Sequence, residues 1–220
     1  MNMEQNQQPQ PPVFNPQQQP SAPQQAPQYQ PRVTARPMMG FLEAIKTCLK
    51  KYADFKGRAR RSEFWWFVLF CFIVYLASSF VMGYVAVWLA DHVDMDPSQL
   101  AIGLVSLVML AFVVPFFAAL TRRLHDTGRS GWWAFIFFVF AVAYYVSYFY
   151  IMWPLMDKLA TDPFGVATAM TEAIMESPTM ATIMSVSGMV VFVMIIIHLV
   201  FTVMDSKWGE NKYGPSPKYQ

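Results

Sequence analysis

Four long apolar runs divide the chain, and each is long enough to cross a lipid bilayer. They cover residues 64–90, 100–120, 132–153 and 183–204, and none contains Asp, Glu, Lys or Arg. A transmembrane helix needs about 20 apolar residues, because each residue rises about 1.5 Å along the axis. Backbone polar groups in hydrocarbon must be hydrogen-bonded within their own segment, so the runs predict helices. The predicted fold class is all-α, an integral membrane bundle of four transmembrane helices.

The first 37 residues are too polar to build a core. Residues 1–37 contain eleven Gln and nine Pro and few apolar side chains. Such a composition is typical of disorder, since little apolar surface can offset the entropy lost on ordering. We predict a disordered cytoplasmic tail at 1–37 and a membrane domain at 38–217. The tail is either a solvated leader or a polyproline-type arm that binds a protein partner.

An amphipathic segment stands between the tail and the first apolar run. Within residues 40–53, apolar side chains from Phe41 to Tyr52 recur at three- and four-residue spacing, with lysines on the opposite face. This spacing predicts a helix. A helix with one apolar and one basic face either lies in the lipid headgroup layer or packs on the bundle. The sequence leaves both arrangements open.

Positive charge is confined to alternate connections. Fifteen of the sixteen Lys and Arg residues lie within 32–61, 122–129 and 207–218, whereas the other two connections are acidic. Cytoplasmic connections of membrane proteins carry the excess of Lys and Arg. Both termini and the second connection are therefore predicted to be cytoplasmic, which agrees with a count of four spans. The net charge of +2 conceals this sidedness.

The second connection carries a dense cluster of charged side chains. The cluster in residues 118–134 consists of Arg122, Arg123, His125, Asp126 and Arg129. As local structure, the stretch predicts a tight helical turn. Gly128 fits the left-handed position after a helix, and Ser130 fits the N-cap of the next one. Trp132 and Trp133 then lie at the headgroup level.

A second cluster on the same side of the membrane precedes the first span. It contains Arg58, Arg61 and Glu63, followed by Trp65 and Trp66. Together, the candidate residues of the cytoplasmic rim are Arg58, Arg61, Glu63, Arg122, Arg123, His125, Asp126 and Arg129, and the candidate interfacial anchors are Trp65, Trp66, Trp132 and Trp133.

Three interpretations fit the two clusters. In the favoured one, Glu63 and Asp126 pair with arginines of the opposite cluster and fix the helix ends. In the second, surplus arginines and the amide groups that open the third helix hold a phosphate or an anionic headgroup. In the third, His125 and Asp126 form an acid–base pair. No H-E-x-x-H or C-x-x-C motif occurs. We therefore assign no catalytic residue, metal or cofactor.

Three motifs resemble those of a known family. They are residues 55–65 (FKGRARRSEFW), residues 122–133 (RRLHDTGRSGWW) and residues 209–215 (GENKYGP). They resemble the signatures of the YhaH-like bacterial inner-membrane proteins, domain of unknown function family 805. The resemblance implies a multi-spanning helical protein of a bacterial inner membrane. It implies no established reaction, cofactor or substrate.

The sequence predicts a non-enzymatic membrane scaffold, or a component that binds a partner or anionic lipid. The expected partners are the bilayer and a protein bound by the tail, with oligomers allowed and no nucleic acid. The alternative is a small oligomeric transporter or channel, and a membrane enzyme acting on lipid or phosphate substrates ranks third. The polar side chains available to a transport path are Ser78, Ser79, Ser106, Ser147, Ser185, Ser187 and His198.

Overall fold

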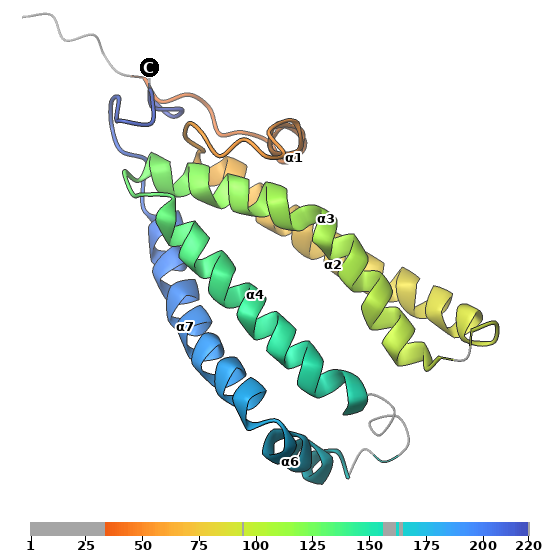
Figure 1. Cartoon of the computed structure of the whole chain (residues 1–220). Coiled ribbons are helices and arrows are strands. Elements are labelled where there is room, and N and C mark those ends of the chain that lie inside the picture. The colour runs from red at the N-terminus through yellow and green to blue at the C-terminus, as the bar shows by residue number, and fades with distance from the viewer. Residues whose placement is uncertain (1–33, 94, 156–161, 163–164, 220) are drawn as a thin grey trace, which may run out of the picture. The chain divides into compact units, whose positions relative to one another are not determined.

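The computed structural model describes residues 34–93, 95–155, 162 and 165–219. The regular elements in this part of the chain are helices (Figure 1). They are α1 (Phe41–Lys50), α2 (Arg61–Ala90), α3 (Pro97–Asp126), α4 (Trp132–Met152) with the short η2 (Trp153–Leu155), α6 (Val166–Glu176) and α7 (Pro178–Val203). Four of them are long and apolar enough to span a membrane, namely α2, α3, α4 with η2, and α7. The all-α fold class with four spans is confirmed.

The limits of the spanning helices differ from those of the apolar runs, most of all in α3 and at the start of α7. Helix α3 covers Pro97–Asp126 rather than 100–120, and α7 covers Pro178–Val203 rather than 183–204. At the start of α3, Pro97 occupies the first turn and the Asp96 side chain accepts from the Ser98 amide at 2.7 Å. The hydropathy pattern identifies the residues that lie within the hydrocarbon layer. Where a helix ends depends instead on its caps and on buried polar partners.

The turn between α3 and α4 closes as a Schellman motif. Gly128 adopts φ +78, its amide donates to His125 O, and the Arg129 amide donates to Leu124 O, both at 2.9 Å. This confirms the position predicted for Gly128. The predicted N-cap is wrong by one residue, because Gly131 caps α4. The Ser130 hydroxyl instead accepts from the Trp132 amide at 3.4 Å.

The spanning helices pack as two antiparallel pairs, α2 with α3 and α4 with α7, and α3 touches α4 less extensively (Figure 1). A buried apolar cluster, which includes Phe64, Phe67, Leu120 and Leu124, lies toward the charged ends of α2 and α3. Along the remaining length, large apolar side chains such as Phe80 stay exposed. That distribution is expected where hydrocarbon, not water, is the surrounding medium.

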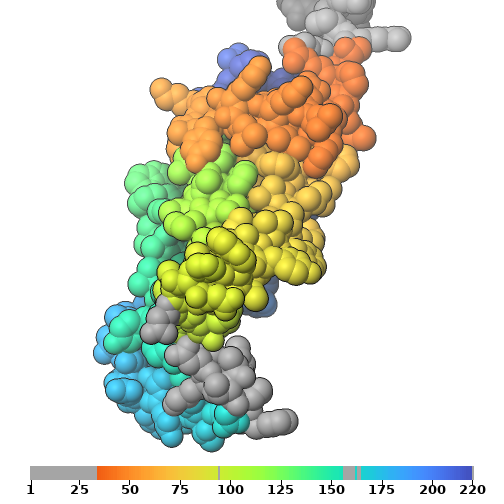
Figure 2. Space-filling view, turned by 90° about the vertical axis from the view of Figure 1, so that its right-hand side faces the viewer, coloured from red at the N-terminus to blue at the C-terminus, as the bar shows by residue number. Residues whose placement is uncertain are grey.

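Helix α1 packs on the ends of α2 and α3, burying Ala44 and Cys48 (Figure 2). A backbone defect in α3 helps to hold it. Pro115 has no amide hydrogen, so the Ala111 carbonyl one turn earlier lacks its helical donor. The Tyr52 hydroxyl donates to that carbonyl at 2.5 Å. The amphipathic helix is therefore confirmed as a helix packed on the bundle.

The described domain includes part of the segment predicted as tail. Residues 1–33 lie outside the described residues, but 34–37 run beside the C-terminal segment. The Arg36 amide donates to Lys218 O at 2.9 Å, and Ala35 forms an isolated antiparallel bridge with Tyr219. Arg60 also donates to the carbonyls of Pro37 and Arg36, at 2.6 and 2.9 Å. Residues 35–37 therefore contact both the C-terminal segment and Arg60, while the predicted boundary at residue 38 stays a prediction.

Close packing of α4 on α7 predicts the effect of a single substitution. A Cβ added at Gly188 would lie 3.1 Å from Tyr144 Cε2, whereas one at Gly83 meets nothing within 4 Å. We expect Gly188→Ile to destabilise the folded chain by about 1–3 kcal/mol through overpacking. Thermal unfolding in detergent measures it, with Gly83→Ile as the matched control. Equal midpoints for the two variants would refute tight α4–α7 packing.

Candidate functional site

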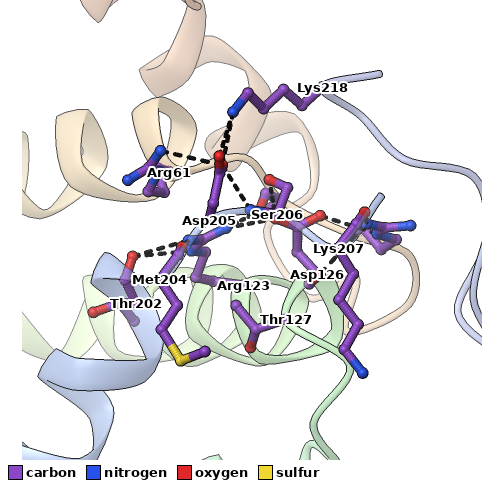
Figure 3. A network of polar contacts seen from close by, with 12 residues as sticks. Arg61, Arg123, Asp126, Thr127, Thr202, Met204, Asp205, Ser206, Lys207 and Lys218 are labelled. Atoms are coloured by element: carbon purple, nitrogen blue, oxygen red, sulfur yellow. Dashed lines mark hydrogen bonds and ion pairs between the residues drawn. The ribbon is translucent and has the colours of Figure 1, made fainter. Parts of the chain in front are cut away.

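A buried carboxylate stands at the centre of the charged clusters (Figure 3). Asp126, at the end of α3, is completely buried. Its carboxylate accepts from Arg58 Nε at 3.0 Å and from Arg123 Nη1 and the Ser206 hydroxyl at 2.5 Å each. These donors come from the segment before α2, from α3 itself and from the segment after α7. We call the buried network formed by Arg58, Glu63, Arg122, Arg123, Asp126 and Ser206 with their partners the polar rim.

Arg58 attaches the C-terminal segment to the end of α3. Its Nη1 donates to the carbonyls of Gly209 and Gly214 at 2.7 and 3.2 Å, and its Nη2 donates to Lys207 O at 2.5 Å. A guanidinium offers five donors in a fixed plane, so it can satisfy a carboxylate and several carbonyls together. The segment after α7 is thereby folded back over the rim, as its Gly and Pro residues suggest.

Arg123 caps the last turn of α7. Its Nε and Nη2 donate to Thr202 O at 3.1 and 3.0 Å, and its Nη2 also donates to Met204 O. The last carbonyls of a helix have no partner within the helix. A buried cation at this end also suits the negative pole of the helix dipole. Arg123 therefore couples the end of α3 to the end of α7.

Arg122, the neighbouring arginine, points to the opposite side and joins α1 and α2 to α3. Its Nη2 lies 3.4 Å from Glu63 Oε1 and 3.8 Å from Cys48 Sγ, and its Nη1 donates to Asp54 O at 2.6 Å and Lys51 O at 3.2 Å. Burial, reinforced by the Glu63 charge, raises the pKa of the Cys48 thiol to about 12. Cys48 is therefore a neutral thiol near pH 7 and not an activated nucleophile.

The predicted pairing across the two clusters is confirmed. Glu63 pairs with Arg122, and Asp126 pairs with Arg58, all with side chains at most 4% exposed. The acid–base arrangement of His125 with Asp126 is not formed. His125 Nδ1 contacts Gly57 O at 3.2 Å, and its ring stacks on Tyr213 at 3.7 Å, away from the Asp126 carboxylate.

An exposed ion pair lies outside the polar rim. Asp205 contacts Arg61 at 3.1 Å and Lys218 at 2.7 Å. The hydrogen bond from Lys218 is the largest of the effects that lower the pKa of Asp205 from 3.8 to about 2. The same bond raises the pKa of Lys218. This pair helps to hold the C-terminal segment near the start of α2.

The lowered pKa of Asp205 predicts a pH dependence. A carboxylate that ionises more readily when folded stabilises the fold above its unfolded pKa and loses that contribution as the pH falls toward its folded pKa. Near pH 7 we expect the free energy of unfolding of the wild-type chain to exceed that of Asp205→Asn by under about 1 kcal/mol, because the Asp205 side chain is half exposed. The difference should vanish between pH 4 and pH 2. Paired thermal unfolding curves measure it, and a difference that grows in acid would contradict this assignment.

The four tryptophans and Arg129 lie around the rim. Trp65 and Trp66 donate from Nε1 to Thr202 O and Met39 O, at 3.4 and 3.1 Å. All four indoles, those of Trp65, Trp66, Trp132 and Trp133, are partly exposed, between 37% and 68%. The Arg129 guanidinium stacks over the Phe201 ring at 3.7 Å. Their role as interfacial anchors stays a prediction.

The polar side chains within the spans mostly bond to their own helices. Ser147 and Ser187 are buried and donate to the carbonyls of Ala143 and Ile183, one turn earlier. His198 Nδ1 contacts Met194 O at 2.6 Å, and its Nε2 has no partner among the described residues. In the same part of the chain, no three His, Cys, Asp or Glu side chains gather as metal ligands.

Sequence reasoning missed several residues of the rim. Ser206 and Asn211 were not singled out as partners, yet Ser206 bonds Asp126 and Asn211 Nδ2 donates to His125 O at 3.0 Å. The third motif, residues 209–215, contains Asn211 and Tyr213 and marks this segment. Ser206 carries no comparable signal.

Four apolar helices of spanning length, joined at one end by a buried polar network, define a multi-pass helical membrane protein. A family model described as "Protein of unknown function (DUF805)" matches residues 52–215, and the chain belongs to this family. It is 40% identical over 94 residues to "Inner membrane protein YhaH" of Escherichia coli (strain K12), covering 41% of this chain and 69% of that protein. It is also 40% identical over 96 residues to "Inner membrane protein YhaI" of the same organism, covering 41% and 67%.

No solved structure matches the chain significantly. Membership of this family, together with the four apolar helices, supports location in a bacterial inner membrane. The surrounding medium of α2, α3, α4 and α7 is therefore a lipid bilayer.

Proposed function

We propose that the protein is a non-enzymatic membrane scaffold that presents its N-terminal tail from a rigid rim to a protein partner. The observation that carries the proposal is the polar rim, whose charged groups bond to one another and to backbone carbonyls of the same chain. Arg58, Arg122, Arg123 and Asp126 are all at most 6% exposed. Buried groups that bond to one another are not available to contact a substrate.

The geometry of the chain ends supports presentation of the tail. The Arg36 amide bonds to Lys218 O, and Arg60 holds the carbonyls just before α1. The segment that follows residue 33 is therefore anchored on the rim. A partner bound to the preceding residues would be held at the membrane surface.

We place the rim on the cytoplasmic side, because positive charge gathers there. Apart from the buried arginines, exposed lysines remain on this side of the chain: Lys46, Lys50, Lys51, Lys56, Lys207 and Lys212. A basic residue near an anionic membrane surface contributes about 1 kcal/mol. Contacts with anionic headgroups are accordingly proposed for these lysines rather than for Arg58, Arg122 and Arg123.

Photocrosslinking in intact cells tests the scaffold. A photoreactive amino acid replaces Lys46 or Lys212 on the rim, and in the matched control it replaces Phe80, which is 72% exposed in the span α2. We expect one discrete protein adduct from the rim positions, lost when residues 2–33 are deleted, and no protein adduct from Phe80. Absence of a rim adduct, or an adduct that survives the deletion, would refute presentation of the tail.

A small oligomeric transporter is the second candidate, and one observation favours it. His198 is 6% exposed within α7, and its Nε2 is unpaired in the described part of the chain. Ionisable side chains within spans are often functional. The test is proton flux into vesicles that contain the wild-type chain or His198→Phe. Flux that is present in the first and lost in the second would favour a transporter over a scaffold.

A further inference from the structure

Helix α1 runs across α2 and α3 rather than along them. In Figure 1 it is seen nearly along its own axis, whereas the spanning helices are seen from the side. Its residues Ala44 and Cys48 are completely buried against the bundle. Because the spans cross the bilayer, a helix that runs across them lies roughly in the plane of the membrane.

The two ends of α1 lie beside apolar residues of the spans. The Phe41 ring packs edge-on against Trp66, with 5.7 Å between the centroids, and Trp66 is the third residue of the first apolar run, 64–90. The Tyr52 hydroxyl, just beyond α1, donates to Ala111 O, inside the second apolar run, 100–120. Helix α1 is therefore level with the edge of the hydrocarbon layer.

The apolar side of α1 is wider than the face that packs on the bundle. Successive residues of a helix turn by about 100°, so Leu42, Ile45 and Leu49 follow one another along one flank. Leu42 is 69% exposed and Leu49 is 40% exposed. The bundle thus leaves two large apolar side chains on this flank uncovered.

Contacts around α1 show which way this flank faces. The Cys48 thiol lies against the polar rim. Going around the helix from Cys48, Phe41 comes next and lies against the first apolar run. Leu49 and Leu42 follow in the same direction, so they face the hydrocarbon layer rather than water.

The charged side chains of α1 lie on its other side. Glu43 and Lys50 are exposed and point away from the flank of Leu42 and Leu49. A helix that lies in the headgroup layer has its apolar side in the hydrocarbon and its basic side toward water. Helix α1 has both this position and this distribution of side chains.

We propose that α1 is an interfacial anchor, with Leu42 and Leu49 inserted into the acyl chains of the leaflet on the rim side. Lipid is the occupant of the uncovered flank, because the residues of α2 and α3 beside it lie in the same hydrocarbon. Ala44 and Cys48 at the same time hold the helix on the bundle. This surface goes beyond the scaffold proposal and is independent of it, since it needs neither the tail nor a protein partner.

Depth-dependent fluorescence quenching in liposomes tests the anchor. An amino acid with a coumarin side chain replaces Leu42 or Leu49 in the full chain, and in the matched control it replaces Lys50 on the opposite side of α1. The liposomes contain phosphatidylglycerol and phosphatidylcholine brominated on its acyl chains, and iodide is present on both sides of the membrane. We expect the brominated lipid to quench more strongly than iodide at Leu42 and Leu49, and the reverse order at Lys50.

Two results would overturn the proposal. Stronger quenching by iodide at Leu42 would place this flank in water, and protection from both quenchers would mean that a second copy of the chain covers it. The expected order should persist in liposomes without phosphatidylglycerol, because packing on the bundle sets the depth of α1. The headgroup contacts proposed for the lysines can therefore fail while the anchor holds, and two probe positions keep the test intact if one variant folds poorly.

Discussion

Asp126→Asn is expected to destabilise the folded chain by about 3–5 kcal/mol, which is among the largest effects that we predict for a single substitution. The carboxylate compensates two buried guanidinium groups, Arg58 and Arg123, and accepts from Ser206. Removing one partner of a buried ion pair leaves uncompensated charge in a medium that solvates it poorly. Thermal unfolding in detergent, with folded yield after size-exclusion chromatography, measures the loss.

Asp205→Asn is the matched control for this substitution. Asp205 also contacts two cations, but its side chain is 48% exposed, so its loss should cost under about 1 kcal/mol. If the two variants unfold at the same temperature, the buried network does not stabilise the rim.

Arg122 and Glu63 should show strong energetic coupling. The single variants Arg122→Met and Glu63→Met each leave a buried charge without its partner, so each is expected to cost about 3–5 kcal/mol. In the double variant no charge is stranded, and apolar side chains of similar volume can occupy the site. The double variant should therefore be more stable than either single one, as measured by a double-mutant cycle of unfolding free energies.

The backbone acceptors of Arg122 limit how much stability the double variant regains. Its Nη1 also satisfies the carbonyls of Lys51 and Asp54, which the double variant leaves unpaired. We therefore expect a double variant that remains less stable than the wild-type chain. Simple addition of the two single losses would show that the pair acts as two separate residues.

The fold could be predicted from the sequence because few backbone conformations are possible in hydrocarbon. Backbone groups within a span must bond internally, so each apolar run has to be a helix. The ends of those helices did not follow from hydropathy. Helix α3 continues beyond Leu120 because the rim buries Arg122, Arg123 and Asp126 completely and supplies their partners.

The sequence was sufficient to predict which charged residues form the site. It was not sufficient to predict which groups each of them contacts. Opposite charges in two clusters on one side predicted pairs for Glu63 and Asp126. Successive helical residues diverge by about 100°, so Arg122 and Arg123 had to face different neighbours. Which neighbours they meet depends on tertiary packing. Most of their acceptors are backbone carbonyls, such as Thr202 O and Asp54 O, and every residue type has one.

The polar rim also has an order of assembly. Asp126 and Ser206 are 80 residues apart, and the fourth span lies between them. During synthesis, the donors of Arg58 and Arg123 acquire their last carbonyl partners only after α7 has left the ribosome. A chain that stops before Ser206 lacks the carbonyls of Lys207, Gly209 and Gly214, which leaves the Arg58 guanidinium incompletely bonded. The network is therefore complete only in copies that have been translated past Gly214.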